Sequence, residues 1–284
     1  MISKQELQYV GDFARKVPYP GDDYARRVID NLADVLSLFK KKYYGKKYSL
    51  ILSNGEEICF EIKEKNLAHL LGIDFKNIST YMKPLLYSIL GFEEYETFTS
   101  FGVLTRIVDN GDMVIKNDAD NHDKFLNYYK VMVKTSCFDK LSEFNEFNFG
   151  CINFDKSIYE SLTGNKFLPV ATKYIFSQND EALIPYCMMG LKSDNGSEVF
   201  IPETFMAPTN FSDYLHNQEL LLPIQLLIND DQNLIKLMAT PEEKIRMLNL
   251  YKSLIQIYNT GSYINIFNDY ETILRDSVAK KKTK

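Results

Sequence analysis

The segment Lys47-Tyr-Ser-Leu-Ile-Leu-Ser-Asn54-Gly55-Glu-Glu-Ile-Cys-Phe-Glu-Ile62 places an Asn-Gly dipeptide between two runs of strand-forming residues. Asn-Gly is the strongest short hairpin signal that a sequence offers, because both residues of the tight turn must accept a positive backbone φ. We therefore predict a β-hairpin over residues 47–62.

A helix is expected on each side of this hairpin. Before it, apolar residues recur at helical spacing between a capping Asp22 or Asp23 and Gly45, which ends the helix after a basic last turn. After it, residues 67–72, Leu-Ala-His-Leu-Leu-Gly, predict a short helix that stops at the glycine. The hairpin is thus expected to lead into a helix that carries a histidine.

The middle of the chain differs from its later part. Residues 76–145 predict several short helices, interrupted by a proline and a glycine, although Val131-Met-Val-Lys-Thr fits either a helix, which we favour, or a strand. Residues 147–228 instead contain short strand-like runs separated by turn residues. Thr240 then caps a final helix that has a proline in its first turn.

These elements predict an α+β fold, in which helices pack on a small antiparallel sheet and a helical insertion occupies the middle of the chain. A length of 284 residues is compatible with a single elaborated domain over 1–284, or with two closely packed halves. We expect three parts: 22–75 with helix, hairpin and histidine-bearing helix, the insertion 76–145, and a strand-rich half 146–260 with the C-terminal helix.

The composition is that of an ordinary globular protein, with 45% hydrophobic and 25% charged residues. No run approaches the roughly 20 apolar residues that span a bilayer, and the start of the chain lacks an apolar signal region. We therefore expect no membrane partner and a cytoplasmic location. The net charge of −5 argues against coating nucleic acid by basicity alone, but leaves a local basic groove open.

Several common chemistries lack their motifs in this sequence. The chain has no Walker-type loop, no Gly-x-Gly-x-x-Gly, no His-Glu-x-x-His and no Gly-x-Ser-x-Gly. Its four cysteines form no Cys-x-x-Cys pair and are interpreted as small buried hydrophobic residues. With three histidines in the whole chain, we expect no metal site, and no cofactor is predicted.

The three histidines carry different interpretations. His122 lies in a polar run and is interpreted as an exposed loop residue. His69 is either a hydrogen-bonded core residue or an imidazole held at a fixed place by its short helix. His216 is either a surface-loop residue or, given its polar neighbours, part of a cleft.

Several segments resemble the phage-borne nuclease-like domains of the barnase, EndoU, colicin and RelE-like group, known as the BECR fold. The first is the hairpin followed by Asn66-Leu-Ala-His-Leu-Leu-Gly-Ile73, which is similar to that family's His-Leu-x-Gly-[Ile/Leu] segment. The later ones are Leu183-Ile-Pro-Tyr-Cys-Met-Met-Gly-Leu-Lys192, Phe200-Ile-Pro-Glu-Thr-Phe205 and Tyr214-Leu-His-Asn-Gln218. The likeness covers roughly residues 45–75 and 172–228.

The resemblance implies a metal-independent endoribonuclease, with a role as a toxin, a phage-related protein or an anti-phage effector. Such cleavage needs a base for the 2′-hydroxyl, an acid for the leaving 5′-oxygen and a cation beside the phosphorane. On this reading RNA is the partner. The candidate catalytic residues are His69, Thr204, Tyr214 and His216, and the candidate substrate-binding residues are Lys173, Lys192, Glu203 and Gln218.

A second hypothesis is a catalytically inert protein-binding module of phage or host-defence origin. The acidic net charge favours it, and 19 Tyr with 19 Phe provide anchors for an interface. Its partner would be another protein, for example an antitoxin.

Overall fold

The computed structural model describes residues 22–73, 91–94, 99–110, 128–141, 146–165, 169–178, 186–193, 199–230 and 233–266. The fold is α+β, which confirms the predicted class. The chain divides into two compact units. The helical unit comprises Met1–Tyr44, Ile62–Asp139 and Glu181–Leu183, and the sheet unit comprises Gly45–Glu61, Lys140–Asp180 and Ile184–Lys284. The predicted hairpin thus groups with the later strands, whereas the helices before and after it group with the central helices.

The helical unit contains α2 (Asp22–Lys42), α3 (Glu64–Leu70), α5 (Ser100–Asn110) and α7 (Tyr128–Leu141). The predicted apolar face of α2 is buried, and Gly45 follows the helix with φ 68°. The ring of Phe39 at the end of α2 lies 6.0 Å from that of Phe101 on α5. The predicted short helices at residues 74–90 and the polar loop with His122 lie outside the described residues.

Helix α7 is the most enclosed helix among the described residues. Its buried side chains lie on all sides of the helix and include Val131, Val133, Cys137 and Leu141. The segment that was compatible with helix or strand is therefore helical, as favoured. A helix with buried residues on all sides is usually enclosed by other parts of the protein. One of the buried residues of α7 is a lysine, Lys134.

The strands of the sheet unit form one ten-stranded sheet in the order β10-β7-β3-β4-β5-β6-β2-β1-β8-β9. Their bounds are β1 (Lys47–Leu52), β2 (Glu57–Phe60), β3 (Phe149–Asn153), β4 (Lys173–Gln178), β5 (Tyr186–Ser193), β6 (Val199–Met206), β7 (Glu219–Leu221), β8 (Pro223–Asp230), β9 (Asn233–Met238) and β10 (Tyr263–Asn265). The sheet is therefore larger than the small one predicted. It is also mixed, because β2 pairs with β6 and β7 with β10 in parallel.

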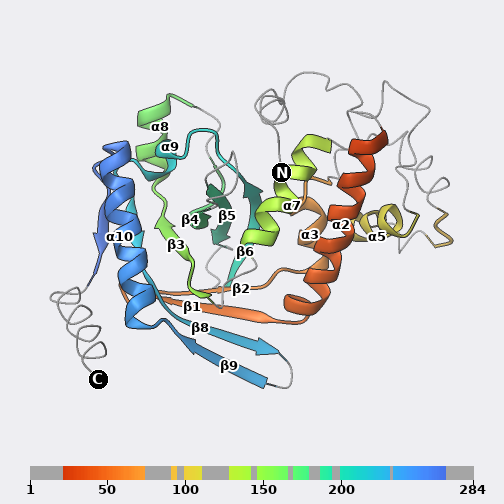
Figure 1. Cartoon of the computed structure of the whole chain (residues 1–284), viewed down its shortest axis with the longest axis horizontal. Coiled ribbons are helices and arrows are strands. Elements are labelled where there is room, and N and C mark those ends of the chain that lie inside the picture. Colours follow the sequence, from red (N-terminus) through yellow and green to blue (C-terminus); the bar gives the residue numbers. More distant parts are fainter. Residues whose placement is uncertain are drawn as a thin grey trace. The chain divides into compact units, whose positions relative to one another are not determined.

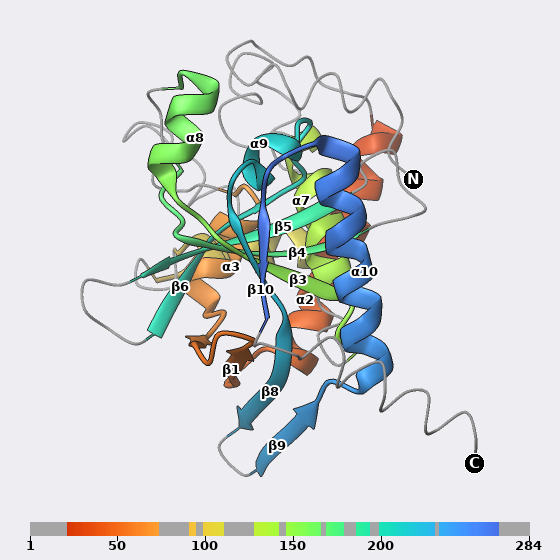
Figure 2. The ribbon, with the colours of Figure 1, turned by 90° about the vertical axis from the view of Figure 1, so that its left-hand side faces the viewer.

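The sheet is strongly curled. Strands β7 and β8 stand near opposite ends of the strand order, yet Leu222 alone separates them along the chain. The Ser53 N–H donates to the carbonyl of Leu222 (2.8 Å), and the Leu222 N–H donates to the Ser53 hydroxyl (3.0 Å). These bonds hold the end of β1 against the β7–β8 junction, and the curved strands are visible in Figures 1 and 2.

The hairpin of β1 and β2 is confirmed, but its turn differs from the predicted one. Of Asn54 and Gly55, only the glycine has a positive φ, 84°. The loop has three residues, and Gly55 is the last residue of a β-turn that begins at Leu52. The Gly55 N–H donates to Leu52 O, and the Leu52 N–H donates to Glu56 O, each at 2.9 Å. Asn54 instead accepts a hydrogen bond from the Glu56 N–H at its side-chain oxygen (2.9 Å).

Three helices cover one face of the sheet: α8 (Lys156–Thr163), α9 (Ser212–Leu215) and α10 (Pro241–Tyr258). Thr240 caps α10 as predicted, in a reciprocal pair with Glu243. Figure 1 shows α10 lying along the sheet unit. On α10, the buried Tyr251 hydroxyl accepts from the Cys151 N–H and donates to Leu221 O, both at 2.8 Å, so it bridges β3 and β7.

Candidate functional site

His69 is exposed on α3. Its neighbours Leu67, Ala68 and Leu70 are buried and anchor the helix in the helical unit, whereas the imidazole faces solvent. The structure therefore removes the alternative of a core histidine. A short helix that is fixed by three buried residues gives an exposed ring a defined position, which a general acid or base requires.

Two lysines of α7 lie beside the end of this helix. Gly72 donates its N–H to the carbonyl of His69 (2.9 Å) and has φ 85°. A Cβ at Gly72 would lie 3.2 Å from Cδ of Lys134 and 3.3 Å from Cδ of Lys130. Lys130 and Lys134 are four residues apart on one face of α7. The aliphatic parts of both side chains therefore pack against Gly72, three residues after His69. Sequence reasoning missed this cluster because α7 lies some 60 residues from the histidine.

Lys134 is the more unusual of the two lysines, since its side chain is only 9% exposed. The pKa of Lys134 is lowered from 10.5 to about 7, chiefly by burial and to a smaller extent by the charge of the neighbouring Lys130, while Cys137 acts in the opposite direction. An amine of this kind exchanges protons near neutral pH, as functional lysines do.

Lys173 lies in the sheet unit, within a row of polar side chains that crosses neighbouring strands. Its ammonium contacts the Glu56 carboxylate at 2.8 Å and donates to the amide oxygen of Asn153 at 2.9 Å. The Asn153 amide then donates to Glu219 (2.7 Å), and so does that of Asn265 (2.6 Å). The partners of Lys173 are thus protein groups, which gives it a structural role. Its predicted role toward a substrate stays a prediction.

Replacing Lys173 with methionine is expected to lower the free energy of unfolding by about 1–3 kcal/mol, because it leaves the half-buried Glu56 carboxylate without its 2.8 Å partner. Lys192, partly exposed on β5, offers a matched control, and Lys192→Met should change stability by less than about 0.5 kcal/mol. Urea unfolding of both variants measures the difference. Equal effects at the two positions would contradict the structural role of the polar row.

The other predicted residues of the sheet unit are spread over several elements. Glu203 and Thr204 lie on β6, both partly exposed, and the Thr204 hydroxyl donates to the carbonyl of Phe205 (3.2 Å). Gln218 is 1% exposed. Its amide oxygen accepts from the Asp155 N–H (2.7 Å) and its amide nitrogen donates to Asp155 O (3.1 Å), so it holds the start of α8 in place.

Tyr214 belongs to an aromatic cluster. Its ring lies 5.2 Å from that of Tyr159, 5.4 Å from Tyr174 and 5.8 Å from Phe154. Burial raises the pKa of the Tyr214 hydroxyl, and Tyr174 and Tyr159 raise it further. A phenol held in its neutral form can donate a hydrogen bond but is a poor proton acceptor at neutral pH.

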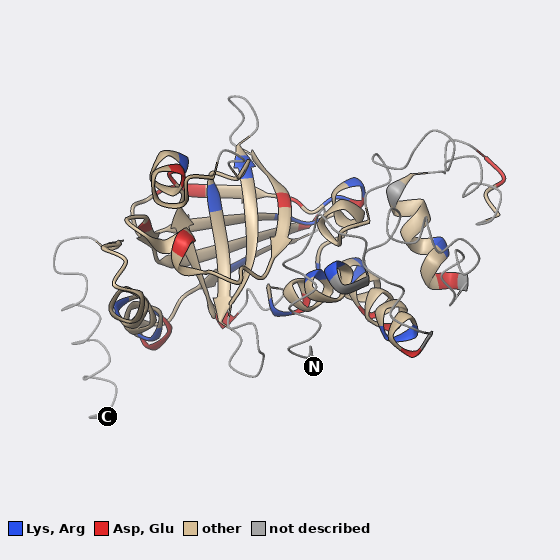
Figure 3. Ribbon diagram, turned by 90° about the horizontal axis from the view of Figure 1, so that it is seen from above, with Lys and Arg blue, Asp and Glu red and all other residues tan. Residues whose placement is uncertain are grey.

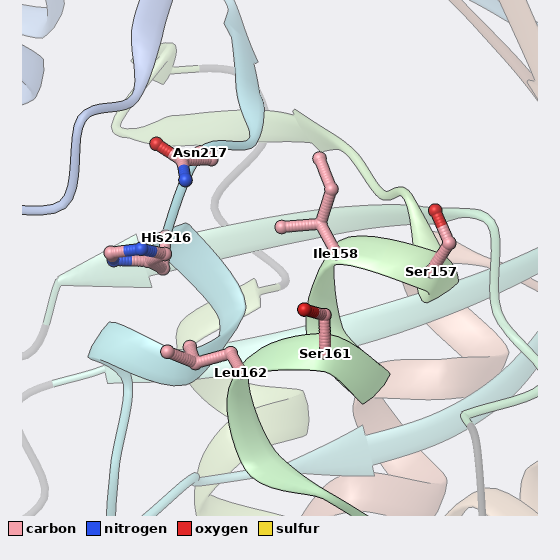
Figure 4. Close-up of a pocket in the computed structure, with 6 residues that line it drawn as sticks. All are labelled: Ser157, Ile158, Ser161, Leu162, His216 and Asn217. Carbon is pink, nitrogen blue, oxygen red and sulfur yellow. The ribbon is translucent and has the colours of Figure 1, made fainter.

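His216 lines an open pocket of about 470 Å³ between α8 and the end of α9. The lining residues are Ser157, Ile158, Ser161, Leu162, His216 and Asn217. Figure 4 shows the first four coming from α8, and His216 with Asn217 coming from the segment across from it. The Ser157 hydroxyl donates to Asp155 (2.6 Å). The remaining lining combines the polar side chains of Ser161, His216 and Asn217 with the apolar pair Ile158 and Leu162.

The predicted site residues thus fall into two groups. His69 belongs to the helical unit, and Thr204, Tyr214, His216, Lys173, Lys192, Glu203 and Gln218 belong to the sheet unit. Figure 3 shows Lys or Arg positions and Asp or Glu positions along the ribbon of each unit.

Comparisons of the chain with protein-family models, with curated proteins and with solved structures find no match. Within the described residues, no group of three or more His, Cys, Asp or Glu side chains is placed to hold a metal ion. None of the described helices is both long and apolar enough to cross a membrane.

Proposed function

We propose that the protein is a metal-independent endoribonuclease whose reactive histidine is His69. The observation that carries the proposal is the exposed imidazole on α3, with the stems of Lys130 and Lys134 crossing Gly72 three residues later. An imidazole and two amines within one local structure are the groups that phosphodiester cleavage without a metal requires.

The proposed reaction uses the 2′-hydroxyl of RNA as its nucleophile. His69 takes the 2′-proton while the 2′-oxygen bonds to phosphorus, and the bond from phosphorus to the 5′-oxygen breaks. The leaving 5′-oxygen takes up a proton from water, so the products are a 2′,3′-cyclic phosphate and a 5′-hydroxyl end. The lysines of α7 stabilise the additional negative charge of the phosphorane. Electrostatic stabilisation of this kind is usually the largest single contribution to catalysis.

The test is RNA cleavage in the presence of EDTA. Purified full-length protein is incubated with total RNA, and the ends of the fragments are analysed for 2′,3′-cyclic phosphate. His69→Ala is expected to reduce cleavage by at least about 10²-fold, since general acid–base catalysis contributes this much or more.

His216→Ala is the matched histidine variant, because His216 is a partly exposed histidine of the other unit. Under the proposal it reduces cleavage less than His69→Ala does. Intact RNA with the wild-type protein would remove the proposal, and a loss confined to His216→Ala would place the reactive histidine in the sheet unit instead.

A further inference from the structure

Three apolar residues of strand β9 are exposed. Leu234 is 66% exposed, Ile235 45% and Met238 53%. The strand is the last in the sheet order and, among described residues, pairs with β8 alone. Figures 1 and 2 both show the β8–β9 hairpin extending away from the central strands of the sheet unit.

The outer edge of β9 has the geometry that accepts another strand. In an antiparallel pair, every second residue directs its backbone N–H and C=O away from its partner strand. The pairing of β9 with β8 is regular over six residue pairs, from Asn233 opposite Asp230 to Met238 opposite Gln225, and contains no bulge. Proteins usually protect such an edge with proline, charges or a bulge, and β9 has a single lysine, Lys236.

The side chains of β9 specify the chemistry of the added strand. Leu234, Lys236 and Met238 alternate on one face, and Ile235 and Leu237 lie on the other. A complementary strand therefore has apolar residues on both faces and an acidic residue opposite Lys236.

The size of the edge favours a linear segment over a second copy of this chain. Six residues span about 20 Å, the length of one short extended peptide. A stable contact between two folded copies requires about 800 Å² from each partner, which one strand edge of this length does not supply.

We propose that β9 binds an extended segment of a partner polypeptide as an added strand, with apolar residues on both of its faces and an acidic side chain that pairs with Lys236. This surface is distinct from the proposed ribonuclease site, so RNA cleavage and strand binding can each fail without the other.

The test selects peptides from a phage-displayed library of random dodecapeptides on the immobilised full chain. We expect the enriched peptides to contain consecutive apolar residues together with Asp or Glu. We also expect them to bind Leu234→Lys at least tenfold more weakly than the wild type. Ile257, 71% exposed on α10, provides the matched control, and Ile257→Lys should leave binding unchanged.

Two further measurements separate strand addition from other modes of binding. Methylating alternate backbone amides of a selected peptide should abolish binding, and Lys236→Glu should shift selection toward peptides with Lys or Arg. The proposal is overturned if no peptide is enriched, if selected peptides bind Leu234→Lys as well as wild type, or if the methylated peptide binds unchanged. A dimer in sedimentation that Leu234→Lys dissociates would likewise overturn it, because the occupant would then be a second copy.

Discussion

Replacing Lys134 with methionine is expected to stabilise the protein at pH 6.5 while it reduces RNA cleavage by about 10²-fold. Methionine keeps an unbranched stem over Gly72, where a Cβ would lie 3.2 Å from Cδ of Lys134, but it removes the amine. The variant thus measures two effects of the amine separately: how much its burial lowers the stability of the protein, and how much it contributes to RNA cleavage in the proposed reaction.

The sign of the effect follows from the pKa of Lys134, which burial and the nearby charge of Lys130 lower from 10.5 to about 7. Between these two values the unfolded chain binds the proton that the folded protein lacks, so stability rises as the pH rises through this window. Below about pH 7 both states are protonated and the folded protein bears the full penalty, on the order of 5 kcal/mol at most from the shift of the pKa. The stabilisation by Lys134→Met should therefore be largest below pH 7 and decline as the pH rises to 9.

Urea unfolding at pH 6.5, 8 and 9 measures this difference, and Lys130→Met provides the matched control. Lys130 lies one turn away on the same helix and is only partly buried. Because its charge contributes to the lowered pKa of Lys134, its replacement should stabilise the protein in the same direction at pH 6.5, but by much less than Lys134→Met does. A stability difference between wild type and Lys134→Met that stays constant from pH 6.5 to 9 would show that burial does not lower the pKa of Lys134 in this way.

The local signals of the sequence predicted most of the elements but not how they combine. The hairpin around Asn54-Gly55, the cap at Thr240 and the apolar periodicity of α2 each depend on a few neighbouring residues, and each is present in the structure. Strand β9 was not predicted, because apolar residues occur on both of its faces and produce no alternation. Strand β10 has three residues, too few for a pattern. The parallel pairing of β2 with β6 joins segments some 140 residues apart, which no local pattern encodes.

For the candidate site too, the sequence predicted single residues but not the contacts that they make with residues far away in the chain. The sequence identified His69 as a candidate, but its exposure depends on which face of α3 packs inward. Lys130 and Lys134 were overlooked, because a lysine within an apolar helix is normally a solvated residue. Conversely, Lys173 was predicted to bind the substrate, and the sequence did not show that its partner Glu56 comes from the hairpin turn 117 residues away.

Replacing Gly150 with alanine is expected to lower the free energy of unfolding by about 3–5 kcal/mol, although it adds a single methyl group. Gly150 has no positive φ, so the backbone itself would accept alanine without strain. The added Cβ, however, would lie 2.4 Å from the hydroxyl oxygen of Tyr251 and 2.5 Å from Cζ of Phe176. Both rings are completely buried and cannot move without opening the core beneath α10.

The cost is large because the displaced hydroxyl is the bridge between β3 and β7. Moving Tyr251 breaks its hydrogen bonds with the Cys151 N–H and the Leu221 carbonyl and leaves two buried backbone groups without partners. Gly164→Ala is the control, because that glycine has φ 64° and open space around it, so the variant bears only the backbone cost, about 1 kcal/mol. If urea unfolding gives the two alanine variants the same stability, the close contact of Gly150 with Tyr251 does not determine how α10 packs on the sheet.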